Sequence, residues 1–206
     1  MLIDVLGKEF DGVLGCDCFS AYRRYMREFD VTLQFCLAHL IRDVKFLMTL
    51  PGKKDQAYGT RLRDALRTLF GVIHQREQMP TGVFQTRLEA ARDAVLQVGQ
   101  QDVPPGRHAQ ALAKRLAAHG KSYFTFVTTP GVQPTNNLAE QAIRFVVIDR
   151  HITQGTRSAG GQRWCERIWS VIATCTQQGK SVFDYLYAVV QSYFGDGKTP
   201  SLLPEG

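Results

Sequence analysis

The chain has 206 residues, of which 44% are hydrophobic and 21% charged, so it holds enough apolar material for one substantial core. Its formal net charge of +6 suits a polyanionic partner but also an ordinary globular protein. No stretch reaches the roughly 18 uninterrupted apolar residues of a membrane-spanning helix, and the five scattered cysteines follow no secretory signal. The sequence therefore predicts a cytoplasmic protein with reduced thiols and no membrane partner.

The first part of the chain predicts alternating helices and strands. Residues 2–10 read as the end of a helix, and residues 12–17 read as a short, largely apolar strand that finishes on an acid. Ser20 is predicted to cap a helix over residues 21–29. Residues 31–36 are β-branched and apolar enough for a second strand. We expect the order helix, strand, helix, strand.

Strand signals disappear after this point, and helical spacing replaces them. A helix over residues 37–50 is predicted to stop at Pro51-Gly52. Three further segments repeat apolar residues at helical spacing without any catalytic signature: residues 62–73, 88–96 and 109–118. The middle of the chain is therefore expected to be a helical hairpin or bundle.

The last third of the chain places an acid at a helix start. Glu140 falls in the first turn of a predicted helix that follows Pro134-Thr135-Asn136-Asn137. Residues 149–161 read as irregular because they carry several glycines and arginines. Two more helices are predicted, over residues 162–177 and 182–194.

Asp17 and Glu140 stand out as candidate ligands for a hard cation, because one closes a strand and the other opens a helix. Mg²⁺ takes oxygen ligands in near-octahedral geometry, and separate rigid elements are suitable mounts for them. Each acid also has a structural interpretation. Asp17 fits a turn after a strand, and Asn137-x-x-Glu140 fits a capping box at the positive end of the helix dipole. Local sequence alone favours these structural roles.

Separate short motifs are spread over nearly the whole chain. They lie at residues 12–17, 19–22, 36–43, 135–144, 146–150, 155–158, 160–161, 172–179 and 184–186. In order and composition they closely resemble the bacterial insertion-sequence sixty-six family of DDE transposases.

The resemblance implies an α/β fold with a ribonuclease-H-like core, truncated at its N-terminus, and a large all-helical insertion. Such a protein would be predominantly helical overall. The implied division is a partial core over residues 1–42, the helical insertion over 43–133, the C-terminal part of the core over 134–194, and a flexible tail over 195–206.

The same resemblance matches Asp17 to the family's second catalytic aspartate and Glu140 to its glutamate. Both would bind Mg²⁺ or Mn²⁺ in DNA strand cleavage and transfer. The family's first aspartate lies on an earlier strand, and Asp4 and Asp11 are not well placed to replace it. We therefore expect a truncated fragment that is inactive or nearly so. Its expected partners are DNA at the insertion-sequence ends and target, together with a homo-oligomer or full-length transposase.

Further candidate DNA contacts come from one histidine and a basic segment. Cys36-x-x-His39 matches an element of many DDE transposases, although a buried cysteine beside a hydrogen-bonded histidine explains it equally well. Zinc is not expected, because a structural zinc site needs four protein ligands. Four arginines are expected at DNA phosphates, with solvated helix faces as the alternative: Arg144, Arg150, Arg157 and Arg163.

Two other classes of function stay open at this point. One is a non-enzymatic DNA-binding or regulatory remnant that associates with full-length transposase. The other is a helical interaction protein in which the two acids are incidental.

Overall fold

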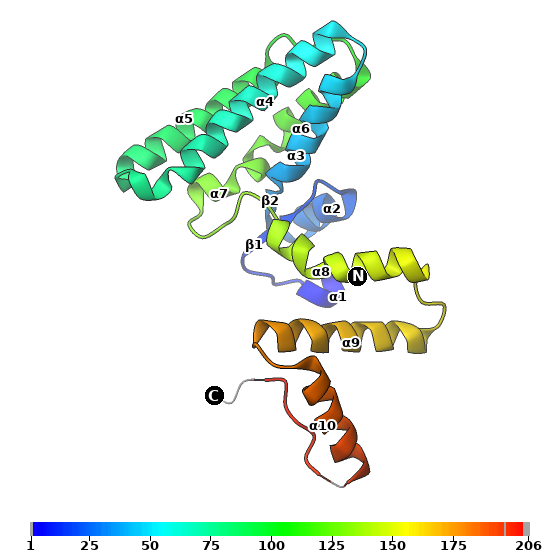
Figure 1. Ribbon diagram of the computed structural model, residues 1–206. Helices are drawn as coiled ribbons and strands as arrows, with labels where there is room; N and C mark the ends of the chain where they lie inside the picture. Colours follow the sequence, from blue (N-terminus) through cyan, green and yellow to red (C-terminus); the bar gives the residue numbers. More distant parts are fainter. Residues whose placement is uncertain (1, 196, 204–206) are drawn as a thin grey trace. The chain divides into compact units, whose positions relative to one another are not determined.

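The structure of the protein is a computed structural model that describes residues 2–195 and 197–203 (Figure 1). The chain divides into two compact units, Met1–Asn137 and Leu138–Gly206. Over the described residues it has two strands and is otherwise built from helices and their connections, which confirms the predominantly helical architecture. None of the described helices is both long enough and apolar enough to cross a membrane.

The N-terminal unit begins with the predicted order of elements: α1 (Leu2–Leu6), β1 (Val13–Cys16), α2 (Ser20–Phe29) and β2 (Thr32–Phe35). The two strands pair in parallel, with Val13 opposite Thr32 and Cys16 opposite Phe35. A parallel pair needs a crossover connection, which α2 provides. Both strands consequently end at the same edge of the sheet.

The predicted cap at Ser20 was wrong. Helix α2 begins at Ser20 itself, and the capping position is held by Phe19 without any side-chain hydrogen bond. The Phe19 N–H instead donates to Oδ1 of Asp17 at 3.1 Å. The carboxylate of Asp17 therefore stabilises the turn between β1 and α2, where the sequence predicted a cap from the Ser20 hydroxyl.

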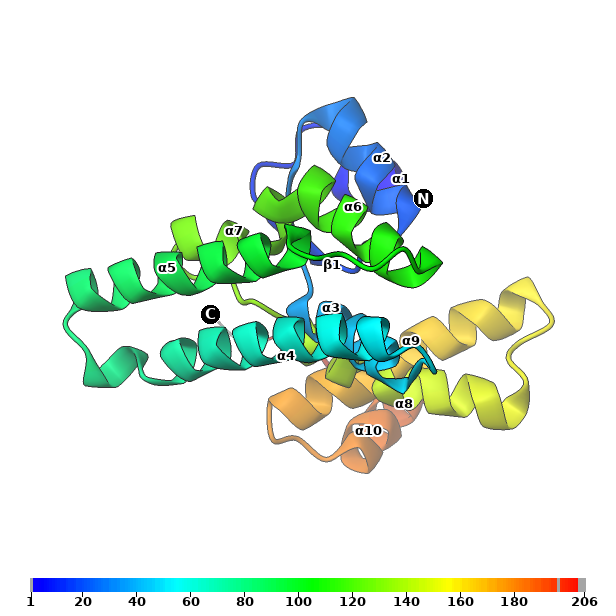
Figure 2. The same ribbon diagram turned by 90° about the horizontal axis from the view of Figure 1, so that it is seen from above.

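A helical bundle completes this unit, as predicted. Its elements are α3 (Leu37–Thr49), α4 (Lys53–His74), the 3₁₀ turn η1 (Arg76–Gln78), α5 (Thr81–Gln100), α6 (Arg107–Tyr123) and α7 (Thr125–Thr128). Helices α4 and α5 form a long hairpin, with α3 packed along α4 (Figures 1 and 2). One continuous apolar core runs from β2 through these helices and includes Phe35, Val44, Leu62 and Val95.

Two contacts fix the spacing of the bundle. At Gly59 of α4, an added Cβ would lie 3.2 Å from the carbonyl oxygen of Val44 and 3.1 Å from Cβ of Leu47, so only glycine allows α3 this close. The buried hydroxyl of Tyr58 donates to the carbonyl of Gly99 at 2.7 Å and joins α4 to α5. The bundle is therefore specified by close approach and satisfied polar groups as well as by apolar burial.

Gln34 fastens the sheet to the bundle. It lies in β2 and is 1% exposed. Its amide nitrogen donates to the carbonyl of Tyr123 at 2.9 Å, and its amide oxygen accepts the N–H of Phe126 at 2.8 Å. The hydroxyl of Thr125 adds a bond to the carbonyl of Leu33 at 2.6 Å. The junction of α6 and α7 is thus bound to β2.

The C-terminal unit contains α8 (Asn137–Thr153), which starts at its boundary, followed by α9 (Ala159–Gln177) and α10 (Val182–Phe194). Serine side chains cap the last two: Ser158 accepts the N–H of Gly161 at 3.1 Å, and Ser181 accepts that of Asp184 at 3.2 Å. Among the described residues of this unit, Cys175 is the one that is buried.

The prediction of an irregular stretch over residues 149–161 was wrong in extent. Helix α8 continues to Thr153, so the irregular connection covers only residues 154–158. The helix ends where Gln154 and Gly155 take positive φ angles of 57° and 77°. The arginines and apolar residues before this point are compatible with a helix, and the left-handed pair is what stops it.

Replacing Gln34 with leucine tests the attachment of the sheet. The substitution leaves the Phe126 N–H and the Tyr123 carbonyl without their buried partner, so the free energy of unfolding should fall by about 2–4 kcal/mol. Urea denaturation measures this. Gln97→Leu, on an exposed position of α5, is the matched control and should change stability by less than about 0.5 kcal/mol. Equal effects of the two variants would contradict the assigned role.

Candidate functional site

Asp17 lies where the sequence predicted it, directly after β1 at the edge where both strands end. The side chain is half-buried, and Oδ1 is held by the Phe19 N–H. No described residue forms a hydrogen bond with Oδ2 or a salt bridge with this carboxylate. The turn therefore orients Asp17 while leaving one of its oxygens for a ligand.

The charge of Asp17 acts on its neighbours. Burial, and then the negative charge of Asp17, raise the pKa of the Cys16 thiol from 9.0 to about 12. The same two causes raise the pKa of the Tyr22 hydroxyl. Both groups stay protonated at neutral pH, so Asp17 is the acid that carries the negative charge at this strand end. A cation bound there would offset that charge.

Three chain segments meet beside Asp17. The N–H of Cys36, directly after β2, donates to the carbonyl of Cys16 at 2.8 Å. The N–H of Leu37 donates to the carbonyl of Pro134 at 2.9 Å, and the N–H of Asn136 donates to the sulfur of Cys36 at 3.4 Å. The approach to α8 is therefore bound to the ends of the two strands within the N-terminal unit.

Asn136 adds an oxygen to this edge. Its side-chain Oδ1 is buried and has no hydrogen-bond partner among the described residues. A buried acceptor left in this state is costly unless something else binds it. The sequence had drawn attention to the Pro134-Thr135-Asn136-Asn137 turn as a helix start, but no local pattern identified Asn136 as part of a site.

Glu140 occupies the predicted place in the first turn of α8, one turn after Asn137, and is partly exposed. It belongs to the C-terminal unit, whereas Asp17 belongs to the N-terminal unit. The meeting of these two carboxylates stays a prediction.

The oxygens at the strand edge suit a hard divalent cation. The carboxylate of Asp17 and the unpartnered amide oxygen of Asn136 are ligands of the type that Mg²⁺ and Mn²⁺ prefer. Within residues 2–195 and 197–203, however, no group of three or more His, Cys, Asp or Glu side chains gathers as a metal site. This edge therefore provides some of the oxygen ligands that Mg²⁺ or Mn²⁺ would need, but not a complete set.

The remaining predicted contacts fall on both units. His39 is half-buried in the first turn of α3. The four predicted arginines are all exposed, with Arg144 and Arg150 on α8, Arg157 in the connection and Arg163 on α9. None of these arginines forms a salt bridge with a described residue. They are therefore free to meet an anion.

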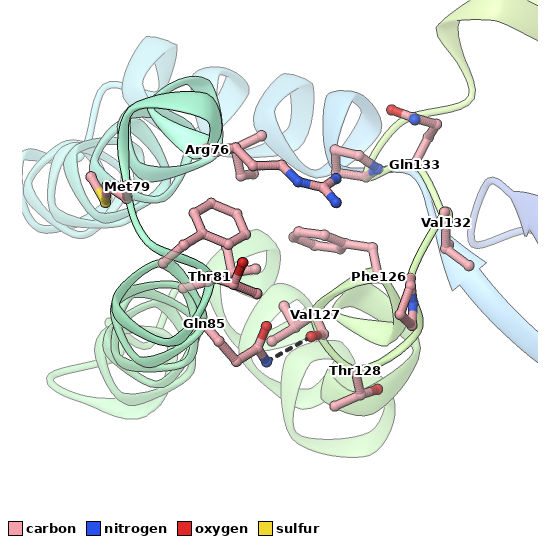
Figure 3. A pocket seen from close by; sticks show the side chains of 15 residues that line it. Arg76, Met79, Thr81, Gln85, Phe126, Val127, Thr128, Val132 and Gln133 are labelled. Carbon is pink, nitrogen blue, oxygen red and sulfur yellow. Dashed lines mark hydrogen bonds between the residues drawn. The ribbon is translucent and has the colours of Figure 1, made fainter.

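The structure also contains a cavity that the sequence did not reveal (Figure 3). It has a volume of about 490 Å³ and lies where the end of α4 and the start of α5 face α7 and the segment after it. Of the described residues that line it, Arg76 alone is charged, and its guanidinium sits 5.9 Å from the ring of Phe84. Gln85 lines one wall and donates to the carbonyl of Val127 at 3.0 Å. The cavity belongs to the helical bundle and does not include Asp17 or Asn136.

The raised pKa of Cys16 predicts a loss of stability in alkali. Because the folded chain binds the thiol proton more tightly than the unfolded chain, stability is fully present below pH 9 and falls as pH rises toward 12. Between pH 8 and pH 10 the wild type should lose about 1 kcal/mol more than Cys16→Ala does. Urea denaturation at each pH measures the difference, and parallel pH profiles would rule out the shift.

Comparison with protein-family models matches residues 2–163 to a family described as Transposase IS66 family. Searches of curated proteins and of solved structures gave no match. The matched region includes the two strands, the helical bundle, Asp17 and Glu140. This confirms the resemblance seen in the sequence motifs, and because the match covers well over half of the chain, the protein belongs to the IS66 family of transposases.

Proposed function

We propose that this chain contributes Asp17 and Glu140 to a DDE-type, metal-dependent site that cleaves and transfers DNA strands in transposition. The observation that carries the proposal is the position of Asp17 at the shared end of two parallel strands, beside the anchored approach to the Glu140 helix. Ligand-binding residues commonly gather at the carboxyl ends of parallel strands. Membership of a transposase family supplies the substrate class, DNA.

Each proposed ligand has a distinct role. Asp17 uses Oδ1 to accept the Phe19 N–H, which fixes the carboxylate, and it offers Oδ2 to the ion. Asn136 offers a neutral oxygen, and Glu140 offers a second carboxylate from the first turn of α8. When bound, Mg²⁺ or Mn²⁺ supplies activation of the attacking hydroxyl or water and stabilisation of charge at the phosphate.

We further propose that residues 1–42 and 134–194 form a ribonuclease-H-like core and that residues 43–133 form a helical insertion. Two facts support the division: both described strands precede residue 42, and the segment before α8 is bound back to the end of β2. The insertion is not a loose appendage in this arrangement, because Gln34 ties β2 to the α6–α7 junction.

In this proposal, Asp17 and Glu140 are two of the three carboxylates of a DDE site. Asp4 lies in α1 and Asp11 in the loop before β1, so neither lies at the end of a strand. A polypeptide of this sequence alone should therefore bind a divalent ion weakly and show no strand transfer. Robust metal-dependent strand transfer by the purified chain would contradict this part of the proposal.

Removing the two proposed ligands tests the site directly. Asp17→Asn and Glu140→Gln should each weaken Mn²⁺ binding by about tenfold or more, because each removes a charged oxygen ligand. Isothermal titration of the 206-residue chain with Mn²⁺ measures the affinity. Asp11→Asn, which changes an exposed acid of the preceding loop, is the matched control and should bind like the wild type. Unchanged binding in both ligand variants would show that the acids are incidental, as in a helical interaction protein.

A second candidate function is a DNA-binding or regulatory protein that associates with full-length transposase or with a second copy. The exposed, unpaired arginines of the described C-terminal unit favour it. Such a protein would bind DNA without needing the carboxylates, so metal binding and DNA binding separate the two candidates.

Neutralising those arginines should weaken DNA binding in a salt-dependent way. Replacing all four with glutamine should reduce the slope of log affinity against log salt by about 3.6, because each phosphate contact contributes about 0.9 for duplex DNA. Fluorescence anisotropy with a labelled duplex at several salt concentrations measures the slope. The control is Arg63→Gln with Arg92→Gln, whose guanidinium groups already pair with Asp64 and Asp93. An equal slope for the wild type, the four-arginine variant and the control would show that DNA binds another part of the chain.

A further inference from the structure

Cys36 lies at the junction of β2 and α3 and is not one of the proposed metal ligands. It is 1% exposed and follows β2, and it holds the capping position of α3. Its N–H bonds to the carbonyl of Cys16, and its sulfur accepts the N–H of Asn136. One residue thereby links the strand that precedes Asp17 to the segment that precedes α8.

The side chain of Cys36 does not serve its own helix. A residue at the capping position usually turns a side-chain oxygen onto the free N–H groups of the first helical turn. Cys36 makes no such bond to α3, and its sulfur faces Asn136 instead. The next residue behaves similarly, because the N–H of Leu37, the first residue of α3, donates to the carbonyl of Pro134. The start of α3 therefore directs two adjacent groups toward the approach to α8.

These bonds satisfy both sides of the junction. Asn136 lies in a partly buried segment, where an N–H without a partner would be costly. Among the described residues, the sulfur of Cys36 is the acceptor for that N–H. Sulfur is a weak acceptor, so the bond itself contributes little strength. A cysteine suits this position because its apolar side chain can be buried while its sulfur reaches the N–H of Asn136.

We propose that Cys36 is a positioning residue for the Glu140 helix, because its sulfur and the neighbouring Leu37 N–H clamp the root of α8 to the strand edge that carries Asp17. The functional consequence rests on the proposed metal site, whereas the clamp itself rests only on these hydrogen bonds. Glu140 lies four residues after the clamped Asn136, in the first turn of α8. A loosened clamp should therefore leave the fold intact while spreading the positions of that carboxylate.

Two substitutions test the role of the Cys36 thiol. Cys36→Ala removes the acceptor. Cys36→Ser supplies a hydroxyl that should turn to cap α3, as serine prefers, so stability should hold or rise while Asn136 still loses its partner. In both variants the amide of Asn136 should exchange with solvent about fivefold faster or more, and Mn²⁺ should bind about fivefold more weakly. Cys175→Ala, a buried thiol in α9, is the control and should change neither quantity.

The backbone half of the clamp has its own matched pair. Leu37→Pro removes the N–H that reaches Pro134, at the first helical position where proline is tolerated, and the extended conformation of Cys36 suits a following proline. Leu37→Ala removes the buried side chain but keeps the N–H. Exchange at Asn136 should accelerate more in Leu37→Pro than in Leu37→Ala.

The measurements are amide exchange by nuclear magnetic resonance, Mn²⁺ titration and urea denaturation of the full 206-residue chain. Faster exchange at Asn136 with an unchanged unfolding free energy supports the clamp. Exchange that stays at the level of Cys175→Ala, or that rises only in proportion to a loss of global stability, would overturn it. If the wild type binds no Mn²⁺, the metal site fails as a proposal, and the exchange rates alone still decide whether Cys36 holds the root of α8.

Discussion

The parallel pairing of β1 with β2 is the constraint on which the rest of the site depends. It brings the chain to the same edge twice, and the bond from the Cys36 N–H to the Cys16 carbonyl closes the pair at that edge. Two parallel strands are a weak structure on their own. Here β2 gains support from the bundle through Gln34, whose amide joins it to the α6–α7 junction. The helical region thus stabilises the edge that presents Asp17.

The role of Asp17 in the turn does not conflict with its proposed role as a metal ligand. Its Oδ1 makes the turn into α2, and its Oδ2 has no described hydrogen-bond partner. A carboxylate that is fixed through one oxygen is better prepared to bind an ion through the other than a freely rotating one. Burial, and then the charge of Asp17, raise the pKa values of Cys16 and Tyr22, so both groups stay protonated beside it. The side chain of Cys36 does not cap its own helix, and its sulfur instead accepts a hydrogen bond from Asn136, in a distant segment.

Much of the fold could be predicted because its signals are local. The strands follow from short, largely apolar runs, and the bounds of α10 follow from Ser181 at its start and Gly195 after its end. The end of α8 was misjudged, because positive φ at Gln154 is a conformational choice that residue type does not announce. The bond between Cys36 and Asn136 joins residues 100 positions apart, so no local pattern could reveal it. The position of Asp17 at the end of a predicted strand marks it as a candidate ligand from sequence alone. The position of Asn136 near that strand end is visible only in the three-dimensional structure.

In the proposed site, Asp17 and Glu140 bind one divalent ion. The most direct measurement is the broadening of amide resonances as Mn²⁺ is added to the isotope-labelled chain, since a paramagnetic ion broadens only nearby nuclei. If both acids bind the ion, the first signals to broaden are those around Asp17, Asn136 and Glu140, while those of the α4–α5 hairpin stay sharp. Broadening at Asp17 without Glu140, or broadening confined to other acids, would contradict it.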